Sequence, residues 1–122
     1  MADQFNLTPQ PARVTGPGSQ TIELALEVSD YDEVDALAGI LGVEGTTTGL
    51  SLRLLTSMQK ESTDGWVPYM TFTPGNLNAA NKFEVLNAST KLLKYLRWEV
   101  TGLGGATAIT FSLGGMLRKR GM

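Results

Sequence analysis

Side chains that could perform catalysis are few in this 122-residue chain, because it contains neither histidine nor cysteine. It therefore lacks the usual general base, the thiol nucleophile and the commonest metal ligands. Composition alone excludes Ser/His/Asp and Cys/His arrangements, and Gly102, Gly104 and Gly105 precede a strand pattern where a phosphate loop would precede a helix. We expect a protein that is not an enzyme, with no catalytic residue and no cofactor.

Three carboxylates lie close together in sequence, at Asp30, Asp32 and Asp35. Clustered oxygen ligands of this kind can bind a hard cation such as Ca²⁺. This segment lacks the spaced glycine and the terminal glutamate of a helix-loop-helix calcium loop. The sequence therefore predicts no metal site here.

Two other groups of side chains could bind a ligand. Tyr95, Arg97 and Glu99 alternate along one expected strand and could form a binding row, although alternating Arg and Glu is also typical of a solvated strand face, and we prefer that interpretation. Trp66 follows an Asp64-Gly65 turn, and Tyr69 lies three residues further on. If both rings were exposed, they could stack on a sugar.

The elements that would position these residues are strands. In the stretch from Gly45 to Phe72 the alternation of Leu50, Leu52 and Leu54 with polar residues predicts one strand. The Asp64-Gly65 turn and the following apolar run predict a second strand, so the stretch is expected to form a β-hairpin.

Alternation also predicts strands over residues 21–28, 83–86, 95–100 and 108–113. Residues 32–45 fit either a helix with Val34, Leu37 and Leu41 on one face or a strand, and we favour the strand because two glycines weaken the helix. The total is about seven or eight strands, which indicates an all-β, antiparallel, jelly-roll-like β-sandwich. The expected core is Leu24, Leu26, Leu52, Leu54, Phe72, Leu96, Trp98, Ile109 and Phe111.

Residues 1–20 are rich in proline and glycine and show no apolar periodicity, so we expect an extended arm that precedes a sandwich domain of residues 21–122. Phe5, Leu7 and Val14 are the apolar anchors that could hold this arm. They would pack either on a neighbouring subunit or on their own domain. The expected subunit interface comprises Phe5, Leu7, Val14, Arg118, Lys119 and Arg120.

Charge is distributed unevenly along the chain, since residues 14–52 contain seven acids and no Lys or Arg, while residues 53–122 contain nine basic residues and four acids. Ordinary solvated charge explains this pattern, but so would acidic and basic surfaces that meet between neighbouring copies of a homo-oligomer. No aromatic residues interleave with the basic run Arg118-Lys119-Arg120, so no specific nucleic-acid partner is expected. There is no run of about 18 apolar residues and no secretory signal pattern, so we expect a soluble protein without a membrane partner.

Several segments, taken in order, resemble small structural proteins of tailed bacteriophages. They are VEGTTTGLSLRLLTSM from residue 43, DGW from residue 64, KYLRWEVTG from residue 94 and TAITFSLGG from residue 107. Phage proteins of this kind carry a strand of the form G-T-[ST]-x-x-L-x-[VL]-x-L-x-[TS]-S, then D-G-x-W, L-x-[RK]-Y-[VL]-R and a closing T-F-S. This chain departs from that pattern by the insertion of Gln59 to Thr63 and by Leu96 where valine is frequent.

The resemblance implies a non-enzymatic virion component, most simply a minor capsid or decoration protein that stabilises the head lattice. Its partners would be the major capsid protein or other virion proteins, and it would be located in the virion, which is assembled in the host cytoplasm. A tail or head-to-tail connector protein is one alternative. A carbohydrate-binding β-sandwich module is another, and it requires Trp66 or Tyr69 to be exposed.

Overall fold

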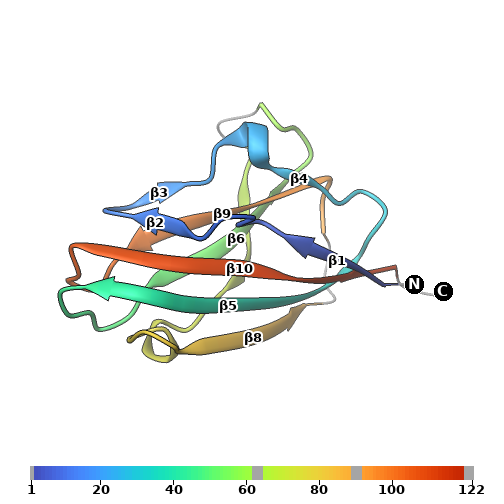
Figure 1. The fold of residues 1–122 in the computed structure, drawn as a ribbon. Coiled ribbons are helices and arrows are strands. Elements are labelled where there is room, and N and C mark those ends of the chain that lie inside the picture. The colour runs from blue at the N-terminus through green and yellow to red at the C-terminus, as the bar shows by residue number, and fades with distance from the viewer. Residues whose placement is uncertain (1, 62–64, 89–91, 120–122) are drawn as a thin grey trace.

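Two antiparallel sheets of five strands each form the computed structural model of the protein, which describes residues 2–61, 65–88 and 92–119 (Figure 1). Sheet A has the order β1-β10-β5-β8, with β2 also paired to β10. Sheet B has the order β3-β9-β6-β7, with β4 also paired to β9. The strands of sheet A are β1 (Ala2–Asn6), β2 (Ala12–Val14), β5 (Glu33–Glu44), β8 (Phe83–Ala88) and β10 (Ala108–Arg118). Those of sheet B are β3 (Gly18–Ser19), β4 (Leu26–Glu27), β6 (Ser51–Ser57), β7 (Val67–Thr71) and β9 (Tyr95–Gly102).

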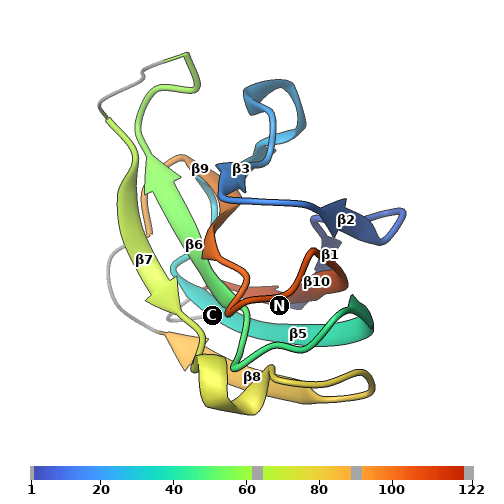
Figure 2. The ribbon, with the colours of Figure 1, turned by 90° about the vertical axis from the view of Figure 1, so that its left-hand side faces the viewer.

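The prediction of an all-β antiparallel sandwich is confirmed, and the strand order is that of a jelly roll. If β1 with β2, and β3 with β4, are each taken as one interrupted strand, the sheets have the orders 1-8-3-6 and 2-7-4-5. Figure 2 shows the two sheets as the walls of a wedge, closed near β7 and β8 and open towards β2 and β3. None of the helices in the described residues has the length and hydrophobicity needed to span a bilayer.

The longest ladder of the fold joins β5 to β10, from Glu33 opposite Arg118 to Glu44 opposite Ala108. Every second side chain of β5 between Val34 and Ile40 is fully buried. This period of two identifies residues 33–44 as a strand, so the strand interpretation of this segment is confirmed and the helical alternative is wrong.

The central hairpin is also confirmed, because β6 pairs with β7 in antiparallel register, with Leu54 opposite Met70. Leu50, Leu52 and Leu54 point into the core. Asp64 of the predicted turn lies outside the described residues.

One predicted strand is mostly wrong. Within residues 21–28, Ile22–Leu24 forms a short 3-10 helix, η1, and only β4 pairs with β9. The neighbouring position on β9 is taken by Gln20, whose backbone N–H donates to the carbonyl oxygen of Trp98 at 3.0 Å. Residues 22–24 therefore have no strand to pair with, and Leu24 is 65% exposed although the sequence places it in the core.

The other expected core residues lie inside or at the margin of the sandwich. Leu26 and Trp98 are half-buried, and the edge of one ring in the Trp98–Phe111 pair meets the face of the other at a centroid distance of 5.1 Å. The remaining members are fully buried, namely Leu52, Leu54, Phe72, Leu96, Ile109 and Phe111.

Residues 2–20 are extended and contribute three strands to the sandwich, so the described residues hold ten strands where about seven or eight were expected. β1 and β2 pair with β10, and β3 pairs with β9. These strands are two to five residues long, which is too short for alternation to give a signal in sequence.

Gly115 gives a test of the β5–β10 ladder. Its φ is +155°, and a Cβ at this position would lie 1.8 Å from the carbonyl oxygen of Asp35. Gly115→Ala should therefore lower the free energy of unfolding by about 2 kcal/mol or more, as measured by chemical denaturation. Gly42→Ala is the matched control in β5, because nothing lies within 4 Å of its added Cβ. It should be neutral or stabilising by up to about 1 kcal/mol, and equal losses for both variants would contradict this close approach of the two strands.

Candidate interaction surface

The apolar anchors expected in the arm pack on their own domain. Phe5 and Leu7 are 6% and 4% exposed and belong to the core, and the N–H of Leu7 donates to the carbonyl oxygen of Leu113. Val14 is half-buried and lies opposite Ile109. The structure thus shows the arrangement in which the arm is held within one chain.

Gln20 ties the end of this segment to both sheets. Its buried side-chain amide donates to the carbonyl oxygen of Leu7 at 2.9 Å, and its side-chain oxygen accepts from the N–H of Trp98 at 3.4 Å. Beside it a mostly apolar cleft of about 450 Å³, with Leu24 and Trp98 among its lining residues, lies between the arm and sheet B. The cleft offers few polar groups that could orient a ligand.

The basic residues expected at the interface lie at the end of β10. Arg118 is its last residue, Lys119 follows it half-exposed, and Arg120 lies outside the described residues. Arg118 is already engaged in its own chain, where its guanidinium forms ion pairs with Asp35 and, at 3.9 Å, with Glu33.

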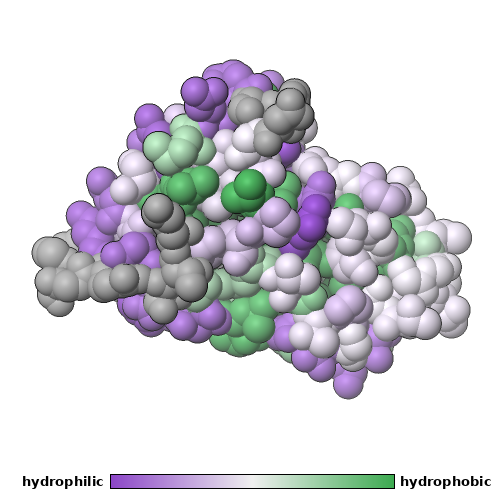
Figure 3. All heavy atoms as spheres, turned by 180° about the vertical axis from the view of Figure 1, so that it is seen from behind, coloured by the Kyte–Doolittle hydropathy of each residue, from purple (hydrophilic) through white to green (hydrophobic). Residues whose placement is uncertain are grey.

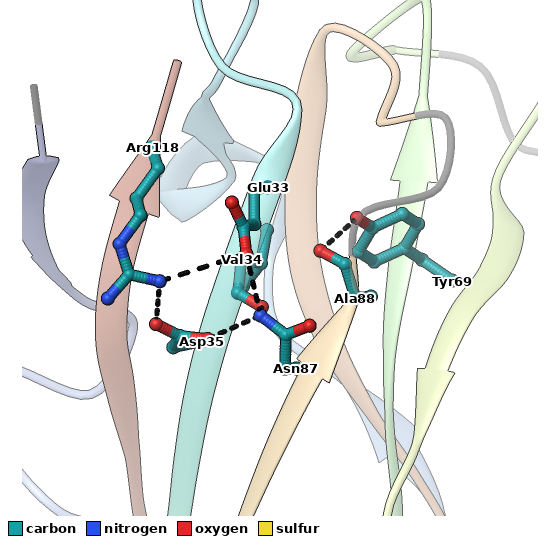
Figure 4. Close-up of polar contacts among 7 residues, drawn as sticks. All are labelled: Glu33, Val34, Asp35, Tyr69, Asn87, Ala88 and Arg118. Atoms are coloured by element: carbon teal, nitrogen blue, oxygen red, sulfur yellow. Dashed lines mark hydrogen bonds and ion pairs between the residues drawn. The ribbon is translucent and has the colours of Figure 1, made fainter. Parts of the chain in front are cut away.

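Arg118 belongs to a polar cluster that we define as Glu33, Asp35, Asn87 and Arg118 (Figure 4). The register of three neighbouring strands, β10, β5 and β8, brings these four side chains together. The Asn87 amide donates to Glu33 at 3.1 Å and to Asp35 at 2.5 Å. Two carboxylates share one guanidinium, so the cluster carries a net negative charge.

The three aspartates Asp30, Asp32 and Asp35 do not form one group of ligands. Asp35 belongs to the polar cluster, and within the described ranges no group of three Asp, Glu, His or Cys residues is placed to hold a metal ion.

An apolar stripe crosses the outer face of sheet A next to this cluster, and we define it as Leu37, Leu41, Phe83 and Val85. Leu37 lies opposite Val85, and Phe83 lies opposite Gly39, where a Cβ would come within 2.7 Å of the Phe83 ring. Phe83 and Val85 are 57% and 67% exposed. The outer face of an antiparallel sheet is often polar, so this apolar stripe is a candidate contact surface.

Sequence reasoning did not identify the apolar stripe as a surface. Alternation separates the two faces of a strand without showing which face is buried. In β8 the side chains of Leu86 and Ala88 pack against the core, whereas Phe83 and Val85 point outwards. The local signal is limited to Phe83 and Val85 on one face of a short predicted strand, and it does not show whether that face is buried.

The aromatic residues proposed for sugar binding are partly covered. The guanidinium of Arg97 lies 4.5 Å from the centre of the Trp66 ring, and it donates to the carbonyl oxygen of Gln20 at 3.0 Å. Burial lowers the pKa of Arg97, and Glu99 partly offsets this effect. Tyr69 is half-buried, and its hydroxyl donates across the sandwich to the carbonyl oxygen of Ala88 at 3.4 Å.

The outer face of sheet B mixes hydrophilic and hydrophobic residues in small areas (Figure 3). On this face Arg53 donates to Glu99 at 2.6 Å across the β6–β9 ladder. Glu99 is thus used in a cross-strand ion pair, and Arg97 is stacked on Trp66. In the Tyr95–Arg97–Glu99 row, Arg97 and Glu99 are therefore already engaged in contacts within the chain.

Comparison with protein-family models and with curated protein sequences finds no match to this chain.

An ion pair between Arg13 of β2 and Glu44 of β5 tests whether the arm lies on its own sheet. The two side chains meet across β10 at 2.9 Å, and hydrogen bonding to Arg13 lowers the pKa of Glu44. Arg13→Gln should return this pKa towards the ordinary glutamate value, as followed by NMR titration of the Glu44 carboxyl carbon.

The sign of the associated stability effect follows from the lowered pKa. The contribution of the pair is present above the pKa of Glu44 in the unfolded chain and is lost as the pH falls through its folded pKa. Both side chains are exposed, so the effect on stability is small. Arg118→Gln is the control and should leave the Glu44 titration unchanged. An ordinary Glu44 pKa in the unsubstituted protein would contradict this placement of β2.

Proposed function

We propose that this chain is a non-enzymatic structural protein of a tailed-phage virion, a minor capsid or decoration protein that binds the head lattice through the outer face of sheet A. The observation that supports this proposal is the apolar stripe. Four large apolar side chains are exposed together on a rigid sheet, beside a polar cluster that could fix orientation. Covering such a surface lowers the free energy of the system, because apolar side chains are removed from water.

The fold adds support by analogy only. Jelly rolls occur in viral capsid proteins and also in lectins, and one fold serves many functions. The sequence resemblance to phage structural proteins favours the capsid role, whereas the partly covered Trp66 ring disfavours sugar stacking. A position in the tail or at the head-to-tail connector would use the same kind of surface.

In this role the protein would act by mass action. A copy that binds the assembled lattice and not its separated subunits shifts the equilibrium towards the assembled shell. Contacts across the seams between capsid subunits would supply the buried area that a stable interface needs. The partners would be the major capsid protein or other virion proteins, at the site of virion assembly in the host cytoplasm.

Binding to particles tests this proposal. Purified protein should cosediment with heads from a phage that encodes this chain, after its gene has been deleted, and it should bind in a fixed ratio to the major capsid protein. Leu37→Asp should weaken this binding at least about tenfold, because it places a charge in the middle of the apolar stripe. The added protein should also raise the temperature at which the heads release their DNA.

The matched control is Val67→Asp, since Val67 and Leu37 are 46% and 44% exposed and Val67 lies on β7 of sheet B. It should bind as the unsubstituted protein does. Binding to tails and not to heads would move the protein to the tail alternative. Failure to bind either particle, together with a shift of Trp66 fluorescence on addition of a glycan, would replace the proposal with the carbohydrate-binding one.

A further inference from the structure

β8 is a weakly protected edge of the sandwich. It lies at the lower margin of the molecule in both Figure 1 and Figure 2, and none of the strands that the structure describes lies beyond it in sheet A. Exposed strand edges invite pairing with another chain, and proteins usually block them with proline, bulges, charged side chains or short strands. β8 contains no proline, and its register with β5 shows no shift. Its one charged residue is Glu84, whose carboxylate is bound by Thr73 and Asn76 of the same chain.

The other edges carry such protection. β7 contains Pro68, and its pairing with β6 shifts register at Leu54/Leu55. β2, β3 and β4 are only two or three residues long. β1 carries Asp3, which accepts a hydrogen bond from the hydroxyl of Tyr31.

The backbone of β8 has a defined free side. The N–H of Ile40 donates to the carbonyl oxygen of Lys82 at 2.9 Å, so Lys82 faces β5. Successive residues of an antiparallel strand alternate in direction, so Glu84, Leu86 and Ala88 also face β5. The N–H and C=O groups of Phe83, Val85 and Asn87 therefore point to the free edge. These are also the residues whose side chains lie on the outer face.

We propose that a second copy of this chain pairs with this edge, β8 against β8 in antiparallel orientation, around a two-fold axis at Val85. In this register Val85 lies opposite Val85 of the second copy, and Phe83 lies opposite Asn87. The three outward-facing residues of each strand then form hydrogen-bonded pairs along its whole length. The two sheets A become one continuous sheet.

Side chains favour this register. Leu37 and Val85 of both copies form one row of four aliphatic residues across the junction, which extends the apolar stripe over two subunits. Glu84 lies opposite Leu86 of the second copy, so the two glutamates do not face each other. The carboxylate of Glu84 accepts hydrogen bonds from the N–H of Thr73 and the side-chain amide of Asn76 in its own chain.

Charge does not oppose a second copy as the occupant. Lys82 is exposed and forms no ion pair with any described residue. The two-fold axis places it beside Ala88 of the second copy, so no two like charges face each other along the paired strands.

This inference does not depend on the virion role, and it is tested on the purified protein alone. The chain contains no cysteine, so each introduced cysteine is a unique reporter. Val85→Cys should give covalent dimers with a short bis-maleimide, because the two-fold axis brings residue 85 next to its own copy. Phe83→Cys and Asn87→Cys should cross-link poorly alone and efficiently when the two variants are mixed.

The control for random collision is Val67→Cys, which is also exposed and lies on the edge strand of sheet B. Sedimentation equilibrium should show a monomer–dimer equilibrium whose association constant falls at least about tenfold in Val85→Lys, because two like charges meet at the axis. Val67→Lys should leave that constant unchanged. Circular dichroism spectra that match those of the unsubstituted protein exclude unfolding as the cause.

Three results would overturn the proposal. One is a protein that remains monomeric at all concentrations, which would leave the β8 edge to a strand of another protein. Another is a dimer that persists unchanged in Val85→Lys. The third is cross-linking of Val85→Cys no stronger than that of Val67→Cys. A dimer with efficient mixed cross-linking of Phe83→Cys and Asn87→Cys establishes both the interface and its register.

Discussion

The ladder between β5 and β10 is the constraint on which the rest of the structure depends. It is the longest pairing of the fold, and every other strand of sheet A hydrogen-bonds to one of these two strands. Its inward residues, from Val34 to Ile40 on one strand and Ile109 to Leu117 on the other, form one wall of the core. Its outward residues position the polar cluster and half of the apolar stripe. Gly115, which allows the two backbones to approach, is therefore as important to the surface as to the core.

The uneven charge of the sequence is partly balanced within one chain. Glu33, Asp35 and Glu44 come from the acidic stretch of residues 14–52, and they are neutralised by Arg118 and Arg13, which lie outside it. Antiparallel pairing of β5 with strand β10, and the presence of β2 on the other side of β10, bring these charges together. The balance is incomplete, since two carboxylates share Arg118 at one end of β5.

Strands of seven residues or more were predictable from sequence, because each is long enough to show the period of two between a buried and an exposed face. This applies to β5, β6, β9 and β10. The short strands of residues 1–20 carry no such signal, and Ile22–Leu24 shows that an alternating segment without a free partner strand does not become a strand. The candidate surface was not predictable, because it depends on which face of β8 turns inwards. That orientation is set by the register with β5, a long-range contact that no local pattern encodes.

The pairing of Ala2 with Arg118 places the first and last described strands side by side at one end of sheet A. A pulling force applied through both ends of the chain would act across this ladder and open its hydrogen bonds one after another, beginning with the outermost pair. Phe5 and Leu7 would leave the core early in that process. The fold therefore offers little mechanical resistance when it is pulled from both ends of the chain. It would bear a larger force through the faces and edges of its sheets.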